Sequence, residues 1–147
     1  MKAIISTTIN TQENRMWDEL QKISSLMHVA SPLLEFKPLS GSRFPKLWHV
    51  GEEYQLKLFF LGIVPLGRHS IKLVEIDPEK KEIISNENGL FTKTWNHRIK
   101  IETIDSHRIT YTDEIEIKAG VLTVSIWLFA HLFYRHRQRK WKQLISR

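Results

Sequence analysis

The stretch WLFAHLFYRHRQRKWK, residues 127–142, changes within one residue from aromatic and aliphatic side chains to a block of arginines and lysines. One stripe nevertheless runs through it, because residues spaced alternately four and three positions apart share a face of a helix. This stripe, widened by its last two members, comprises Thr123, Trp127, Ala130, Tyr134, Arg137, Trp141, Leu144, Ile126 and Phe133. It predicts a long helix over residues 120–146 that packs on a sheet.

The basic block accounts for the whole net charge of +6, since residues 135–147 carry six basic and no acidic side chains. We expect a solvated helix end in which Arg137 covers apolar surface with its stem while its head reaches an acceptor at the edge of the sheet. The side chains expected to be exposed are Arg135, Arg139, Lys140 and Lys142. The apolar part, residues 121–134, is shorter than the roughly 18–20 residues of a membrane span, so no transmembrane segment is predicted.

Length and composition fit a folded protein. The 147 residues predict one domain, residues 1–147, and the 41% hydrophobic and 26% charged content is ordinary for such a domain. The chain has no cysteine, which excludes disulfides, thiolate catalysis and cysteine zinc sites. The N-terminal stretch MKAIISTTINTQEN is a poor signal peptide, so we expect a cytoplasmic protein.

The other elements are predicted from periodicity and turn residues. Residues 2–9 are rich in β-branched side chains and predict a strand. Asn10 or Thr11 can cap a helix, and Asn10 with Glu13 has capping-box spacing. A helical face follows, with a second short helix expected at 25–30: Met16, Trp17, Leu20, Ile23 and Met27. Residues 33–118 alternate strands with turns, one of them at 40–42, and predict antiparallel neighbours in a seven-stranded sheet.

Strand, two helices, six strands and a long final helix is the element order of the START-like, or SRPBCC, superfamily. Three segments resemble those of small bacterial members without an assigned activity: 95-WNHRI-99, 111-YTDEIEIKAG-120 and 134-YRHRQRKW-141. The resemblance covers essentially the whole chain. It implies the α+β helix-grip fold, also called polyketide cyclase/dehydrase- and lipid-transport-like, in which a curved antiparallel sheet wraps around the C-terminal helix.

That resemblance also implies a cavity between sheet and helix, which often binds hydrophobic molecules. The superfamily includes lipid carriers, hormone receptors, cyclases and oxygenase subunits. Because one fold serves all of these, the fold alone does not choose among them.

Strand alternation brings two polar residues onto an apolar face. In residues 95–103 and 109–117 the odd-numbered positions are mostly apolar, and His97 and Asp113 lie among them. A hairpin loop at 104–106 would place the two directly opposite each other, and a loop at 105–107 would make them diagonal neighbours. In both registers their side chains are close enough to interact.

The His97–Asp113 pair has two interpretations. It can be a general acid/base in which the carboxylate orients the imidazole, or a satisfied buried polar pair. No serine, cysteine or glycine-rich nucleophile elbow accompanies it, which favours the structural interpretation. A metal site would need a third ligand, for which His131 is the candidate. We expect no metal and no cofactor.

Side chains on the inner faces are candidates for a ligand pocket, with His97, Asp113 and His131 as its polar groups. The apolar candidates are Trp48, Tyr54, Leu58, Trp95, Tyr111 and Trp127. The turn 59-FFLGIVPLG-67 is apolar, so it folds into the core, forms the lip of a cavity, or makes a contact surface. Leu128 and Leu132 lie on the helix face opposite the sheet. A homodimer or covering loops are preferred there to a bilayer surface.

Three functions fit these features. The first is the binding or carrying of a hydrophobic small molecule, and the second is a cyclase- or hydrolase-like enzyme that uses His97 and Asp113. The third is peripheral binding to an anionic membrane surface through the basic helix end. Nucleic acid is disfavoured, because the body is neutral and no strand has an exposed basic and aromatic face. The first is preferred for its inward aromatic face and the lack of a recognisable nucleophile.

Overall fold

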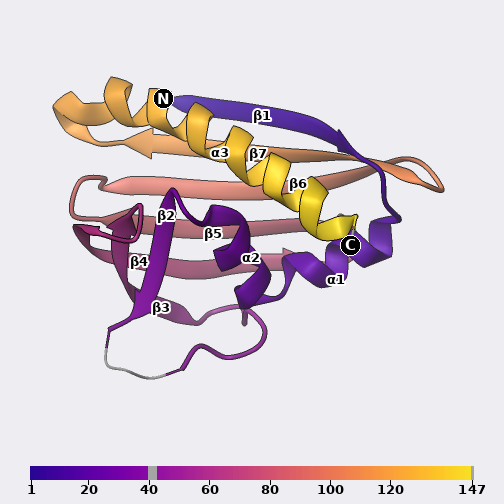
Figure 1. Ribbon diagram of the computed structural model, residues 1–147, viewed down its shortest axis with the longest axis horizontal. Coiled ribbons are helices and arrows are strands. Elements are labelled where there is room, and N and C mark those ends of the chain that lie inside the picture. Colours follow the sequence, from indigo (N-terminus) through magenta and orange to yellow (C-terminus); the bar gives the residue numbers. More distant parts are fainter. Residues whose placement is uncertain (40–42, 147) are drawn as a thin grey trace.

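Seven antiparallel strands form one sheet in the computed structural model of the protein, which describes residues 1–39 and 43–146 (Figure 1). The order across the sheet is β1-β7-β6-β5-β4-β3-β2, which confirms the predicted strand number and leaves β1 and β2 as open edges. The strands are β1 (Lys2–Ile9), β2 (Leu34–Pro38), β3 (Glu53–Phe60), β4 (Val64–Asp77), β5 (Glu82–Gly89), β6 (Thr94–Asp105) and β7 (Arg108–Lys118). The turn predicted at residues 40–42 lies outside the described residues, as does Arg147.

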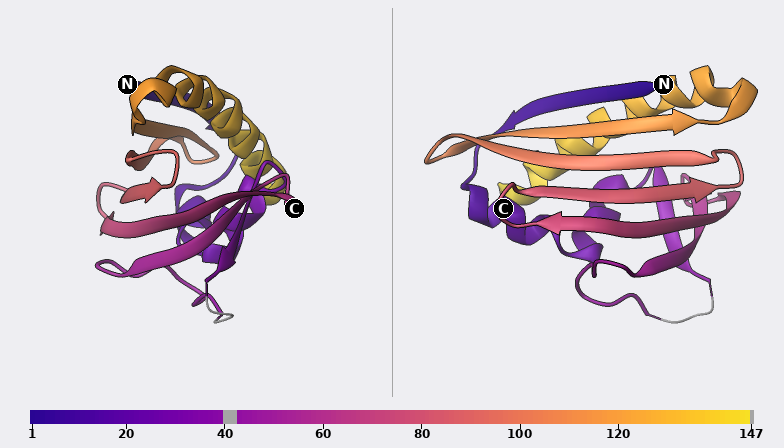
Figure 2. Two further views of the ribbon diagram at one scale, coloured as in Figure 1. Left: turned by 90° about the vertical axis from the view of Figure 1, so that its left-hand side faces the viewer. Right: turned by 180° about the vertical axis from the view of Figure 1, so that it is seen from behind.

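The long helix α3 (Thr123–Ile145) lies along the concave side of the sheet (Figure 2). It packs on β1, on β7 and on the short helix α2 (Ile23–Ala30). This arrangement confirms the predicted helix-grip fold. Among the described residues, no helix combines the length and apolarity needed to cross a membrane.

The predicted stripe of α3 faces the sheet for most of its length. Ala130, Tyr134 and Trp141 are buried as expected. Trp127 is only half-buried, because it lies over the edge strand β1, where its indole Nε1 donates a hydrogen bond to the carbonyl of Lys2 at 2.7 Å.

At the far end of α3, burial of Trp141 and Ile145 holds the basic segment against the protein. Arg135, Arg139 and Lys142 are exposed as predicted. Lys140 departs from the prediction, since it is half-buried.

The start of the first helix differs from the prediction. Helix α1 (Glu13–Leu20) is preceded by Gln12, and neither Asn10 nor Thr11 caps it. The carboxylate of Glu13 is bonded instead to the hydroxyl of Thr103 and lies 3.9 Å from the ammonium of Lys81, so it does not reach back for a capping box.

The second helix also begins earlier than expected, at Ile23 and not at residue 25. The helical conformation is interrupted between α1 and α2 because the backbone there pairs with the segment before β3. The amide of Trp48 donates to the carbonyl of Gln21 at 3.0 Å, and the amide of Ile23 donates to that of Lys46 at 3.2 Å. Long-range pairing of this kind cannot be read from helical periodicity.

Candidate ligand-binding site

A cavity of about 380 Å³ lies between the sheet and the helices. Because α3 packs on β1 and β7, the inner face of that half of the sheet is covered, and the cavity lies over the other strands. Its wall is mostly apolar and comes from α2, α3 and strands β2 to β6. Among the apolar residues that line it are Leu26, Met27, Leu34, Phe36, Trp48, Leu56, Leu58, Phe60, Ile71, Ile83, Trp95, Ile126, Phe129 and Phe133.

Four residues predicted from the sequence lie in this wall: Trp48, Leu58, Trp95 and His97. Tyr54 lies behind Trp48, with its ring edge-on to the indole at 4.9 Å between centroids. A role of these residues in ligand binding stays a prediction.

The other predicted residues do not line the cavity. Tyr111 and Asp113 belong to β7, which α3 covers, and the Tyr111 ring contacts Trp141 of that helix. Trp127 and His131 pack edge to face at 4.5 Å near β1. Alternation correctly gave the inward direction of the β7 side chains, but it carries no information about which strands a helix will cover.

The His97–Asp113 pair is formed, in the second of the two predicted registers. Ile99 lies opposite Asp113 and His97 lies opposite Ile115, so the pair is diagonal. His97 Nε2 donates to Asp113 Oδ1 at 2.7 Å. Asp113 is 0% exposed, whereas His97 lines the cavity.

Both carboxylate oxygens of Asp113 accept hydrogen bonds from donors of the protein. Besides that of His97, the carboxylate accepts hydrogen bonds from the hydroxyl of Tyr111 at 3.0 Å and from Nε2 of Gln138 at 3.1 Å. Burial, followed by the negative charge of Asp113, raises the pKa of Tyr111 well above its ordinary value, so the phenol stays a donor. Asp113 therefore holds the imidazole of His97 in place from a position that the cavity does not reach.

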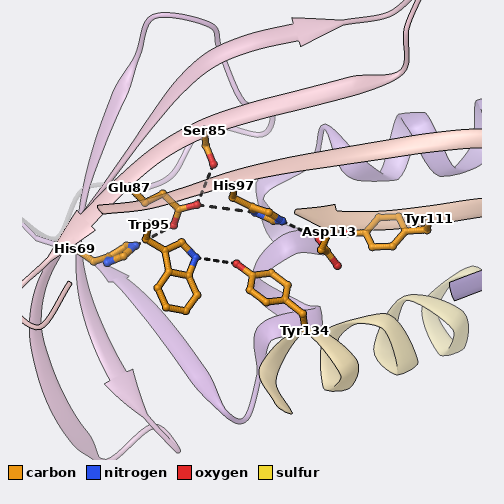
Figure 3. A network of polar contacts seen from close by, with 8 residues as sticks. All are labelled: His69, Ser85, Glu87, Trp95, His97, Tyr111, Asp113 and Tyr134. Atoms are coloured by element: carbon orange, nitrogen blue, oxygen red, sulfur yellow. Dashed lines mark hydrogen bonds and ion pairs between the residues drawn. The ribbon is translucent and has the colours of Figure 1, made fainter. Parts of the chain in front are cut away.

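A second carboxylate, Glu87 of β5, completes a chain of polar groups (Figure 3). It accepts hydrogen bonds from His69 Nε2 at 2.9 Å and from the hydroxyl of Ser85 at 2.9 Å, and its Oε2 lies 4.0 Å from Nδ1 of His97. The imidazole of His97 thus lies between two carboxylates. Burial acts to raise the pKa of Glu87. The hydrogen bond and charge of His69, together with the charge of His97 and the hydrogen bond from Ser85, outweigh burial and lower that pKa below its ordinary value.

Glu87, His69 and Ser85 line the cavity but were not predicted. Alternation could have found them, because Ser85 and Glu87 are in phase with the buried Ile83 on one strand. His69 is likewise in phase with Ile71 on the next.

Arg137 is the most unexpected member of the site. Its side chain lines the cavity and is 7% exposed, and its guanidinium carbon lies 5.0 Å from the ring centroid of Tyr134 and 5.7 Å from that of Phe133. The prediction that its head reaches an acceptor at the edge of the sheet is wrong. The guanidinium makes no hydrogen bond or ion pair with any described residue, and its Nε is buried without a partner. Burial acts to lower the pKa of Arg137, but Tyr111, Asp113 and other nearby groups raise it.

Tyr134 connects this arginine to the rest of the site. Its hydroxyl accepts a hydrogen bond from Trp95 Nε1 at 2.9 Å, and its ring lies against His97 at 4.9 Å between centroids. Burial raises the pKa of Tyr134 above its ordinary value, so the phenol is uncharged at neutral pH.

The cavity opens at the end of the sheet where α3 begins. Leu90, Phe91 and Leu122 line it and are also exposed, Leu90 to 72%. The β3–β4 hairpin lies at the same end (Figure 1) and contributes Phe60 and Leu66 to the wall. Of the three alternatives for the apolar turn at residues 59–67, the structure therefore favours the lip of a cavity.

Leu128 and Leu132 remain exposed, to 59% and 61%, so no described loop covers them. A homodimer that would cover them stays a prediction. His131 lies away from the His97–Asp113 pair, against Trp127. No cluster of three or more potential ligands able to hold a metal ion occurs within residues 1–39 and 43–146.

Solved structures share this architecture at low sequence identity. A START superfamily protein from Mycobacterium smegmatis is 11% identical with a TM-score of 0.68, over 99% of this chain and 97% of its own. Major latex-like protein 151 from Panax ginseng is 14% identical with a TM-score of 0.64, over 99% and 97%. Norcoclaurine synthase from Thalictrum flavum, solved in complex with dopamine and hydroxybenzaldehyde, is 14% identical with a TM-score of 0.64, over 99% and 87%.

These similarities show that the chain has the START-like, helix-grip fold. No curated protein matches the chain. A family model does match, over residues 7–144, and it is described as a domain of unknown function, DUF8410. The chain therefore belongs to the DUF8410 family.

Proposed function

We propose that this protein binds and carries a hydrophobic small molecule in the cavity between its sheet and α3. The observation that carries the proposal is the cavity itself. Its volume of about 380 Å³ falls within the roughly 300–1,000 Å³ that is usual for small-molecule sites. Its wall also has the usual composition of such sites, many apolar side chains with a few convergent polar groups, here His69, Glu87, His97 and Arg137.

The position of the opening supports the same function. Exposed apolar side chains at the mouth, among them Leu90, Phe91 and Leu122, give a hydrophobic molecule a path from its source to the interior. Among proteins of similar fold, norcoclaurine synthase was solved with two small aromatic molecules. We propose that this chain, like that protein, binds a small molecule, and that it is located in the cytoplasm.

An enzyme that uses His97 is the second candidate, because this imidazole lines the cavity while Asp113 orients it from behind. The hydrogen-bonding of the ring argues against it. Nε2 is bonded to Asp113 and Nδ1 faces Glu87 at 4.0 Å, so neither nitrogen is left without a carboxylate beside it. We therefore favour a structural role for the pair and binding as the function.

Peripheral binding to an anionic membrane through the basic helix end is the third candidate. Arg139 and Lys142 are exposed at that end. The mouth of the cavity lies at the opposite end of α3, about 30 Å away along a helix that rises about 1.5 Å per residue. The basic end is therefore poorly placed to bring the mouth to a bilayer.

A fluorescent apolar probe tests the proposal. N-phenyl-1-naphthylamine, which is uncharged, should bind with a rise in fluorescence at a single site. Leu58→Trp places a larger side chain in the wall and should weaken binding, whereas Val74→Trp on the exposed face of β4 should not. Circular dichroism of both variants checks that the fold is kept. Equal binding by both variants and the native protein would place the probe elsewhere and contradict the proposal.

A further inference from the structure

We propose that the molecule bound in this cavity carries an anionic head group of the carboxylate class, and that Arg137 is the residue that binds it. The inference rests on the proposed function and specifies its ligand as an elongated apolar molecule with a carboxylate at its inner end. It follows from the hydrogen-bonding state of Arg137, from the partners of the nearby acids and from the shape of the wall.

The guanidinium of Arg137 is a buried cation with unused donors. Arginine stays protonated in proteins, and its five N–H groups form a planar fork that matches a carboxylate. The side chain is 7% exposed, yet the guanidinium makes no hydrogen bond or ion pair with the described part of the chain. The rings of Tyr134 and Phe133 attract the cation through their faces. Such contacts supply no acceptor for the N–H groups.

The two carboxylates whose charges act on this arginine, Glu87 and Asp113, already have hydrogen-bond donors. Glu87 accepts from His69 and Ser85. Asp113 accepts through both of its oxygens, and it lies behind His97 and outside the cavity wall. Both carboxylates favour the charged form of Arg137 electrostatically, but neither is its hydrogen-bond acceptor. An acceptor supplied by a ligand would complete the set, because buried charges need hydrogen-bonding partners.

The wall places an apolar body next to that head group. Ile126, Phe129 and Phe133 line the cavity on the same helix as Arg137, in the direction of the mouth. From Ile126 to Arg137 the helix rises about 16 Å at about 1.5 Å per residue. The α3 side of the cavity is therefore mostly apolar from the mouth inward and leads to a guanidinium, which fits a medium-chain alkyl carboxylate entering head first.

A matched pair of ligands tests the assignment. Dodecanoate and 1-dodecanol share a chain and differ at the head group, and each would displace N-phenyl-1-naphthylamine from the native protein. A charge-assisted contact predicts that dodecanoate binds about ten- to a hundredfold more tightly than the alcohol. Arg137→Gln should remove this preference by weakening dodecanoate alone. Arg137→Lys, which keeps the charge but loses the planar fork, should retain part of it. Arg139→Gln on the exposed face of α3 is the control and should behave like the native protein.

The outcomes separate the two claims. Equal affinities of the native protein for acid and alcohol would overturn the role of Arg137 while leaving the carrier function intact, and this test does not depend on how well any variant folds. Tighter binding of dodecylamine than of dodecanoate would also overturn it, and would point to Glu87 as the head-group residue. Failure of the neutral probe and of all three ligands to bind would reject the proposed function itself.

Discussion

His97 donates a hydrogen bond to Asp113 at 2.7 Å, and of the two only His97 reaches the cavity. The carboxylate behind it is bonded to donors from β6, from β7 and from α3. The pair therefore ties the long helix to the sheet at the floor of the site. It also holds the imidazole of His97 against the ring of Tyr134, at a tilted angle of 54° between the two planes.

Removal of either partner should destabilise the fold. His97→Ala and Asp113→Ala should each lower the free energy of unfolding by roughly 1–3 kcal/mol, because a buried polar group loses its partner. Asp113→Ala should lower the free energy of unfolding more, since it also removes a hydrogen-bond acceptor from Tyr111 and from Gln138. Urea denaturation measures both, with the exposed Glu102→Ala as a control expected to change stability by less than about 0.5 kcal/mol. If neither variant changed the free energy of unfolding, the pair would not be buried as described.

Glu87 should make stability depend on acid. Its pKa in the folded protein is lowered below the ordinary value of 4.5, so its contribution is fully present above that value. The contribution is lost as the pH falls through the folded pKa. Glu87→Gln should therefore be less stable than the native protein at neutral pH, and the difference should shrink below pH 4.5.

A further variant tests whether His69 is the cause of this dependence of stability on pH. His69→Gln removes the donor that most strongly lowers the pKa of Glu87, so it should reduce this acid-dependent difference. Urea denaturation at neutral pH and under acid conditions measures all three proteins. A stability difference between the native protein and Glu87→Gln that is constant with pH would show that Glu87 gains nothing from its partners.

The basic side chains at the end of α3 should contribute less to stability than the buried ring of Trp141. Replacing Arg139, Lys140 and Lys142 together with glutamine should barely move the melting temperature, because these side chains are wholly or partly in water. Trp141→Ala should cost about 3–5 kcal/mol, because Trp141 is 0% exposed. Thermal unfolding followed by circular dichroism measures both. The opposite result would mean that α3 is rotated about its axis, with the basic side chains and not Trp141 facing the sheet.

The triple glutamine variant also tests surface binding. If it abolished salt-dependent binding to anionic vesicles while the fold stayed intact, the basic end would be functional and membrane binding would replace the carrier proposal. The carrier proposal predicts that the variant binds apolar probes like the native protein.

Much of the fold follows from local pattern. Alternation in β6 and β7 correctly put His97 and Asp113 on one face, and the stripe of α3 correctly predicted Ala130, Tyr134 and Trp141 as buried. These predictions succeed because a strand repeats every second residue and a helix about every 3.6 residues, whatever surrounds them.

The misses concern contacts between distant segments. Arg137 was placed on the correct face, but whether its head meets an acceptor depends on side chains from other strands. Tyr111 was correctly assigned inward and is sealed by Trp141, because α3 crosses that half of the sheet. Asn10 and Glu13 have capping-box spacing, but the carboxylate of Glu13 accepts a hydrogen bond from the hydroxyl of Thr103 instead. Each outcome is decided by tertiary packing, which periodicity does not encode.

Native mass spectrometry of the protein as purified tests the central claim most directly. We expect a species heavier than the bare chain by the mass of one apolar molecule. This species should disappear after extraction with organic solvent and reappear, with the mass of dodecanoate, when that acid is added back. A spectrum that shows only the bare chain, before extraction and after addition of dodecanoate or 1-dodecanol, would contradict a ligand-binding function for this cavity.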